Sequence, residues 1–372
     1  MPRRGSGWPL SSSVLLKSTK NTKDAKGPVL FLYGASALLP DTFRMFRVFG
    51  GQVPRLSSVS PRPDMSRRDA TRLIAAATAG TLLPFGTSQM LGANETNAMI
   101  TRAIPPSGEK VPVIGLGTWQ TFDVGSSQSE RAPLEQVLSE LTKLGGRVID
   151  SSPMYGRSEE VIGDLATKLQ SQEKLFLATK VWTTGRQAGV DSMDRSFRRF
   201  RTKRIDLMQV HNLVDVTTHL PTMREWKAAG RFRYIGVTHY NESAFSEVEK
   251  VLRSEKLDFL QINYSLGERE ADRRILPLAQ ERGVAVMINR PFGGGGLFRQ
   301  VRSKPLPDWA AEFDCRSWAQ FLLKWIVGHT AVTCVIPATA DPDHLRDNAA
   351  AGIGKLPDAK MRQRMAEYVG TL

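Results

Sequence analysis

The sequence has 372 residues, of which 41% are hydrophobic and 24% charged, a composition typical of globular proteins that bury a full core without disulfide or metal support. Its formal net charge is +14, but residues 1–98 carry 13 Lys and Arg against 5 Asp and Glu, so more than half of the net positive charge lies in residues 1–98. The remaining positive charge is spread over residues 99–372 without a basic stripe, which argues against a nucleic-acid partner. The two cysteines, Cys315 and Cys334, have no metal-ligand spacing, so we expect two buried thiols and no metal site.

Residues 1–98 differ in composition from the rest of the chain. Residues 1–64 are rich in Arg, Lys, Ser and Pro without a sustained period, and we interpret them as a disordered extension or the product of an upstream start codon. Residues 65–98 begin MSRRDATRLIAAATAG, in which Arg67 and Arg68 precede a short apolar run. This order predicts a twin-arginine-type export signal and a periplasmic protein; a transit segment, or a plain tail on a cytoplasmic protein, is the alternative. The run is too short to predict a stable membrane span.

From Met99 onward, short β-branched runs alternate with longer segments that have the apolar spacing of helices. This alternation predicts an α/β fold in which residues 99–372 form one (β/α)8 barrel. Before the first barrel strand, MITRAIPPSGEKVPVIG has a turn sequence between two short apolar arms and predicts a hairpin that caps the barrel bottom. The eight strands are expected at Val113–Gly117, Arg147–Asp150, Leu175–Lys180, Asp206–His211, Tyr234–Thr238, Phe259–Tyr264, Ala285–Arg290 and Val332–Pro337.

Polar residues stand where several predicted strands end. Asp150 ends the second strand, Lys180 the third and His211 the fourth, and Tyr155 lies in the loop after the second. Catalytic groups of such barrels sit at the carboxyl ends of the strands, so we expect these four side chains to meet at one mouth.

The four groups complement one another chemically. An ammonium beside a phenol favours the phenolate and lowers the pKa of the phenol, and a carboxylate keeps the half-buried ammonium charged. The imidazole of His211 can donate a hydrogen bond to a carbonyl oxygen. The set is suited to protonating a carbonyl oxygen while a nucleophile attacks its carbon, and a bound hydride donor would supply that nucleophile.

Seven segments, in order, resemble the signature segments of the aldo-keto reductase family: VIGLGTW, VIDSSPMYGRSEEVIG, LATKVW, LMQVHN, YIGVTHYN, LQINYS and CVIPATADPDHLRDN. The resemblance implies a (β/α)8 barrel that binds an extended nicotinamide dinucleotide without a Rossmann domain. It also implies a catalytic tetrad, carried onto Asp150, Tyr155, Lys180 and His211, with Tyr155 as the general acid. NADPH is the first choice of cofactor, and NADH is possible.

The resemblance also assigns nucleotide contacts. Polar side chains after two strands match those that hold the nicotinamide carboxamide, the segment NRPFGGGGLF matches the loop that crosses the pyrophosphate, and the last segment matches the adenosine 2′-phosphate clamp. Relatives carry basic residues in that clamp, where this sequence has Ala338, Thr339, Ala340 and Asp341. His344 is the one clamp residue that can become positively charged. Arg346 lies two residues further along, so on a helix we expect it to point elsewhere. Asn289 replaces a stacking aromatic. The assigned residues are Thr118, Thr238, His239, Gln261, Arg290, Pro291, Phe292, Gly293, Gly294, Pro337, Ala338, Thr339, His344 and Asn348.

The substrate prediction rests on two aromatic positions. Trp119 and Trp182 match residues that line the pocket mouth of the family, which predicts an apolar or aromatic carbonyl substrate. The short chain after Asn348 predicts an open pocket for several aldehydes, ketones or quinones; the alternative is that residues 303–315 form one wall. We therefore predict an NAD(P)H-dependent oxidoreductase that reduces carbonyls to alcohols. Two alternatives remain open: a non-catalytic nucleotide-binding or regulatory barrel within a larger complex, and a lyase that uses Lys180 as a Schiff base.

Overall fold

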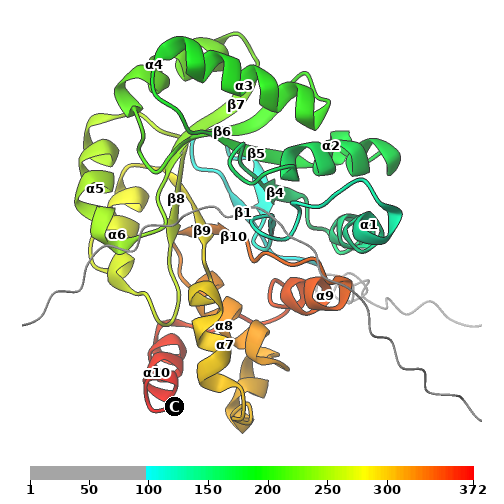
Figure 1. The fold of residues 1–372 in the computed structure, drawn as a ribbon. Helices are drawn as coiled ribbons and strands as arrows, with labels where there is room; N and C mark the ends of the chain where they lie inside the picture. The colour runs from blue at the N-terminus through cyan, green and yellow to red at the C-terminus, as the bar shows by residue number, and fades with distance from the viewer. Residues whose placement is uncertain (1–97) are drawn as a thin grey trace, which may run out of the picture. The chain divides into compact units, whose positions relative to one another are not determined.

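The structure, a computed structural model, describes residues 98–372 (Figure 1). The predicted extension at 1–64 and the predicted export signal after it lie outside the described residues, apart from position 98, and stay predictions. None of the helices in the described part of the chain is long and apolar enough to cross a membrane.

Eight parallel strands form one sheet, in the order β10-β9-β8-β7-β6-β5-β4-β3. Parallel bridges from Ile114 to Val335 and from Gly117 to Ala338 join the two edges and close the sheet into a barrel. The predicted (β/α)8 barrel is therefore confirmed. The strands are β3 (Leu116–Gly117), β4 (Val148–Asp150), β5 (Phe176–Val181), β6 (Ile205–His211), β7 (Phe232–Thr238), β8 (Phe259–Asn263), β9 (Ala285–Asn289) and β10 (Val332–Val335).

Helices follow the strands and surround the barrel (Figure 1). The first of them begins after Ser127, whose hydroxyl accepts the backbone N–H of Glu130, and its buried stripe of Leu134, Val137, Leu138 and Leu141 has the spacing of one helix face. The helices are α1 (Gln128–Lys143), α2 (Ser158–Lys168), α3 (Arg186–Phe200), α4 (Val216–Ala228), α5 (Phe245–Ser254), α6 (Ile275–Glu281), α7 (Gly296–Val301), α8 (Trp318–Val327), α9 (Pro342–Ala350) and α10 (Ala359–Gly370). Short 3₁₀ helices lie at Gln172–Lys174, Glu242–Ala244, Glu270–Asp272, Gly293–Gly295 and Asp308–Phe313.

A two-stranded hairpin, β1 (Thr101–Ala103) and β2 (Lys110–Pro112), precedes the barrel. Ile104 and Val111 are fully buried among the interior residues of the barrel. Arg102 donates hydrogen bonds to the backbone carbonyls of Val327, His329 and Val332, and Val332 is the first residue of β10. The hairpin thus closes the amino-terminal end of the strands, as predicted.

The strands alternate between the barrel interior and the surrounding helices. One buried cluster fills the interior and takes every second residue of the strands: Val148, Phe176, Ala178, Leu207, Tyr234, Phe259, Ala285, Met287, Cys334 and Ile336, together with the two hairpin residues. The intervening strand residues, such as Leu177 and Met208, belong to the cluster that packs on the helices. Since the period of a strand is two, the residues further along on the interior face must also point inward.

Candidate active site

The same alternation places polar side chains above the apolar interior. On β4, Asp150 follows Val148 on the interior face; on β5, Lys180 follows Ala178; and on β6, His211 lies four residues after Leu207. All of these polar residues are buried. The strand ends therefore bring the predicted Asp, Lys and His together in one polar layer at the carboxyl end of the barrel.

Lys180 and Asp150 form a fully desolvated ion pair. The Lys180 Nζ atom lies 2.6 Å from Asp150 Oδ2, and the exposed fractions of the two side chains are 0% and 4%. Lys180 also donates to the backbone carbonyl of Ser151 at 2.6 Å. Burial by itself lowers the pKa of Lys180, but the attraction of Asp150 and Tyr155 outweighs it and raises the pKa above its ordinary value. Lys180 is consequently an ammonium at neutral pH.

Two glutamines hold the second oxygen of the Asp150 carboxylate. Gln261 Nε2 donates to Asp150 Oδ1 at 2.8 Å, and Gln209 Nε2 donates to the same atom at 3.2 Å. Thr118 donates from Oγ1 to the backbone carbonyl of Asp150 at 2.9 Å. The two glutamines and Lys180 thus compensate a carboxylate that burial would otherwise destabilise, while Thr118 holds the backbone next to it.

Tyr155 enters the site from the loop after β4. Its ring centroid lies 4.9 Å from Lys180 Nζ and 6.0 Å from the ring of His211, with the two rings nearly perpendicular. Burial raises the pKa of Tyr155 above its ordinary value of 10.0, and Asp150 adds to that rise, while Lys180 opposes it. The predicted effect of the ammonium is present, but the expected net lowering is wrong because burial is the larger cause. Tyr155 therefore carries its proton at neutral pH.

His211 is neutral in this environment. Burial, followed by the nearby Lys180 ammonium, lowers the pKa of His211 from 6.5 to about 3. Its Nδ1 atom lies 3.1 Å from the hydroxyl oxygen of Ser152, and its ring centroid lies 6.1 Å from that of Trp182. A neutral imidazole beside Tyr155 is a hydrogen-bond donor that adds no charge to the site.

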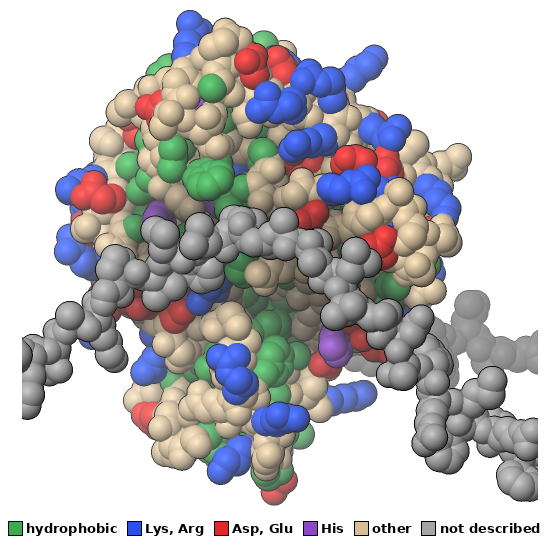
Figure 2. Space-filling view, viewed as in Figure 1, with side chains coloured by type: hydrophobic (Ala, Val, Ile, Leu, Met, Phe, Trp, Pro, Cys, Tyr) green, Lys and Arg blue, Asp and Glu red, His purple; other side chains and the backbone are tan. Residues whose placement is uncertain are grey.

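Large apolar side chains are exposed around the polar layer. The exposed fraction is 48% for Trp119, which directly follows Thr118, and 46% for Trp182, which directly follows β5. Met154 and Tyr240 are also exposed, at 40% and 50%. On the face in Figure 2, hydrophobic side chains gather near the middle, and Lys and Arg are interspersed with Asp and Glu around them.

The predicted carboxamide contacts are partly used inside the protein. Thr238 donates to Gln261 Oε1 at 3.1 Å, while the amide nitrogen of Gln261 is committed to Asp150. Asn289 donates to the backbone carbonyl of His239 at 3.2 Å, and its own Oδ1 is buried without a partner among the described residues. Arg290 Nε is likewise buried and unpartnered, although Arg290 Nη2 pairs with Glu268 at 3.2 Å. Such orphaned atoms are suited to contacting a bound ligand.

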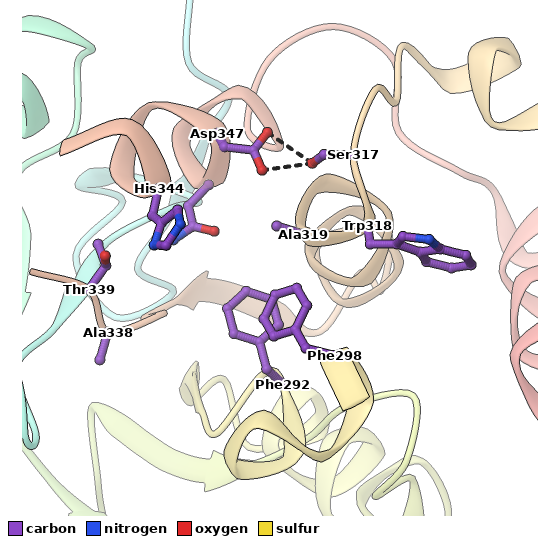
Figure 3. Close-up of a pocket in the computed structure, with 10 residues that line it drawn as sticks. Phe292, Phe298, Ser317, Trp318, Ala319, Ala338, Thr339, His344 and Asp347 are labelled. Atoms are coloured by element: carbon purple, nitrogen blue, oxygen red, sulfur yellow. Dashed lines mark hydrogen bonds between the residues drawn. The ribbon is translucent and has the colours of Figure 1, made fainter. Parts of the chain in front are cut away.

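A cleft of about 460 Å³ is lined by the loop after β9, α7, α8, the segment after β10 and α9 (Figure 3). Five of the predicted nucleotide residues line it, and the others do not. Its lining residues are Phe292, Phe298, Ser317, Trp318, Ala319, Ala338, Thr339, His344, Asp347 and Asn348. Before the cleft, Gly293, Gly294 and Gly295 all have positive φ, at 56°, 62° and 85°. Residues with a side chain would adopt this backbone only with strain, which explains the glycines. The amides of Gly293 and Gly295 donate to the backbone carbonyls of Arg290 and Phe292, at 2.9 and 3.0 Å, and so close the loop on itself.

The cleft contains little positive charge. Among the described residues that line it, His344 is the one basic side chain, and Asp347 is held by Ser317 at 2.8 Å and Gln320 at 2.7 Å. Asp341 caps α9 by accepting the backbone N–H of Asp343 at 2.7 Å. Arg346 pairs with Asp343 and lies 3.6 Å from Glu140 on α1, so it does point elsewhere, as predicted.

Comparisons with known proteins agree with this geometry. A sequence model of the aldo/keto reductase family matches residues 113–366. The chain belongs to this family. The methylglyoxal reductase YeaE of Escherichia coli is 29% identical over 271 residues, covering 71% of this chain and 93% of that protein. An aldo-keto reductase of Klebsiella pneumoniae solved in complex with NADPH has 25% identity, a TM-score of 0.62, and covers 73% of this chain and 96% of its own. The Bacillus halodurans aldo-keto reductase AKR11C1 in its holo form has 21% identity and a TM-score of 0.60, with 73% and 96% coverage.

This aldo/keto reductase is thus an oxidoreductase built on the predicted barrel. The Schiff-base alternative is disfavoured, because Lys180 is a buried ammonium held by Asp150 rather than a free amine. Sequence reasoning missed two polar partners, Gln209 and Ser152. The signal for Gln209 was available, since it lies two residues before His211 and therefore on the same face of its strand.

Proposed function

We propose that this aldo/keto reductase reduces aldehyde and ketone carbonyls to alcohols, with NAD(P)H as hydride donor and Tyr155 as general acid. The observation that carries the proposal is the position of Tyr155. The ring of its protonated phenol lies 4.9 Å from the Lys180 ammonium and 6.0 Å from the neutral ring of His211, next to the buried layer that contains Asp150.

Each side chain has a separate task in the proposed reaction. A reduced nicotinamide, when bound, would supply the hydride that the carbonyl carbon accepts. The O–H bond of Tyr155 breaks, and its proton forms a new O–H bond on the carbonyl oxygen, leaving a phenolate that the Lys180 ammonium stabilises. Asp150 keeps Lys180 charged and in place, and His211 donates a hydrogen bond that orients the carbonyl oxygen.

The residues present fit a nicotinamide dinucleotide. The unpartnered atoms of Asn289 and Arg290, the cleft residue Phe292 and the glycine segment 293–295 follow one another in sequence, from the end of β9 into the loop after it. We propose NADPH as the first choice, supported by the NADPH complex of the Klebsiella relative, with NADH also accepted because His344 is the sole basic residue among the described cleft lining. Exposed Trp119 and Trp182 favour a substrate with an apolar side, and methylglyoxal is a suitable first probe.

The test is Tyr155→Phe, which removes the donated proton and keeps the ring. We expect carbonyl reduction, followed as loss of the reduced nicotinamide's absorbance, to fall about 100-fold to 10,000-fold while nucleotide affinity stays unchanged. Tyr368→Phe is the matched control, since Tyr368 lies on α10 against Trp309 and its hydroxyl has no hydrogen-bond partner in the described structure. A Tyr155→Phe rate within a few-fold of wild type would refute Tyr155 as the acid. Binding without turnover in wild type would favour the regulatory alternative.

A further inference from the structure

Ser152 lies in the loop after β4, and its exposed fraction is 0%. Its hydroxyl oxygen has two partners among the described residues. The backbone N–H of Met154 donates to it at 3.3 Å, and His211 Nδ1 lies 3.1 Å from it. The other ring nitrogen of His211, Nε2, has no hydrogen-bond partner among the described residues, so Ser152 is the side chain that restricts this ring.

The number of hydrogens decides between the two tautomers of the ring. A neutral imidazole has one N–H donor and one acceptor nitrogen, and a serine hydroxyl has one donor. If Nδ1 carried the hydrogen it would donate to Ser152, and the Ser152 hydroxyl, fully buried, would have no acceptor in the described part of the chain. If Ser152 donates to Nδ1 instead, both groups are satisfied and the ring hydrogen is on Nε2. An orphaned buried hydroxyl is costly enough to bias the tautomers by about tenfold to a hundredfold.

We propose that Ser152 is a positioning residue that donates its hydroxyl hydrogen to His211 Nδ1 and so holds the ring in the tautomer with hydrogen on Nε2. This proposal rests on the proposed function, in which His211 donates a hydrogen bond to the carbonyl oxygen. Nε2, the ring nitrogen without a partner among the described residues, then carries the hydrogen that His211 can donate. Ser152 contacts no reacting atom; it acts through His211.

The experiment is nitrogen NMR of the full chain labelled with ¹⁵N-histidine, without nucleotide or substrate. The chain has five histidines, so His211 can be assigned by the signals that disappear in His211→Asn. In wild type at neutral pH we expect His211 to carry hydrogen on Nε2 and to show Nδ1 as an acceptor. In Ser152→Ala both nitrogens should shift toward the averaged values of a tautomer mixture, and Ser152→Thr, which keeps a hydroxyl, should restore the wild-type signals.

Ser151→Ala is the matched control. Ser151 directly precedes Ser152, and its buried hydroxyl has no hydrogen-bond partner among the described residues, so its loss should leave the His211 signals unchanged. Hydrogen on Nδ1 in wild type, or His211 signals in Ser152→Ala identical to wild type, would overturn the proposal. Because this readout needs no turnover, it stays interpretable if carbonyl reduction itself is not found.

Steady-state kinetics give a second, independent readout. Loss of the fixed tautomer should lower kcat of Ser152→Ala about twofold, because an even tautomer mixture leaves about half of the enzyme able to donate to the carbonyl, while KM for the nucleotide stays unchanged. Recovery of kcat in Ser152→Thr separates this effect from a general loosening of the loop. Equal loss in both variants would contradict a role for the hydroxyl.

Discussion

Lys180→Met is the change that most directly tests the buried ion pair. The substitution keeps the length and apolar stem of the side chain and removes the ammonium from a position whose exposed fraction is 0%. Asp150 then remains buried as a carboxylate without its counter-charge. Removing one partner of such a pair costs about 3–5 kcal/mol of folding stability. Gln209 and Gln261 still donate to Asp150, so we expect the lower end, about 3 kcal/mol.

The double variant makes the prediction specific. Asp150→Asn combined with Lys180→Met removes both charges and keeps both shapes, so no unpaired charge is left in the barrel. We expect the double variant to be more stable than the sum of the single effects predicts, by about 2 kcal/mol or more, which is the range of coupling for residues in direct contact.

Urea unfolding followed by tryptophan fluorescence measures these free energies. Lys250→Met is the matched control, because Lys250 forms an ion pair with Glu247 in which both side chains are mostly exposed, at 71% and 59%. Its unfolding midpoint should stay close to wild type. A cost below about 1 kcal/mol for Lys180→Met, or strict additivity in the double variant, would refute the conclusion that burial makes this pair one coupled unit.

Three further predictions follow from charge and protonation. The pKa of His211 is lowered from 6.5 to about 3, so on acidification the unfolded chain binds this proton before the folded chain does; the contribution of His211 to stability is complete above pH 6.5 and is lost as pH falls toward 3, at about 1.4 kcal/mol per pH unit. The free energy of unfolding of His211→Asn should lack this slope across the same range. Parallel plots of unfolding free energy against pH for wild type and His211→Asn would contradict the prediction. Ala338→Arg adds a cation to the cleft and should tighten NADPH about tenfold or more relative to NADH in fluorescence titrations; an unchanged ratio would place the 2′-phosphate elsewhere. We propose export through the signal at 65–98, so replacing Arg67 and Arg68 with Lys should keep the protein in the cytoplasm on fractionation, and unchanged distribution would refute it.

The barrel was predictable because its signal is local. β-branched runs and helix-period segments alternate eight times, and each predicted strand overlaps an observed one. The first strand is shorter than its sequence predicts. Residues 113–117 were predicted as strand, but β3 spans only Leu116–Gly117, with an isolated bridge at Ile114. A side chain at Gly117 would lie 2.7 Å from the Ile336 carbonyl, so the close approach that closes the barrel depends on a distant segment.

The site was predictable in its members and less so in its energetics. Asp150, Lys180 and His211 stand at strand ends, which sequence patterns locate. The rise in the pKa of Tyr155 depends on how much water the folded site excludes, and that is a property of many surrounding residues. The commitment of Gln261 to Asp150 was likewise hidden, because sequence spacing gives the face of a strand and not the direction of an amide.

The link between the fold and the chemistry lies in one change of residue type along the interior face. Ala178 belongs to the apolar interior, and two residues later on the same face of β5 stands Lys180. On β8 the same step leads from Phe259 to Gln261. The charged layer therefore packs on the apolar interior residues of the barrel. This packing explains why the Lys180 ammonium is not exposed to solvent and why Asp150 alone supplies its counter-charge. A substitution that admitted water beneath this layer would weaken the ion pair and the tuning of the phenol together, so under the proposed mechanism the packing of these apolar residues affects the reaction as well as the stability of the fold.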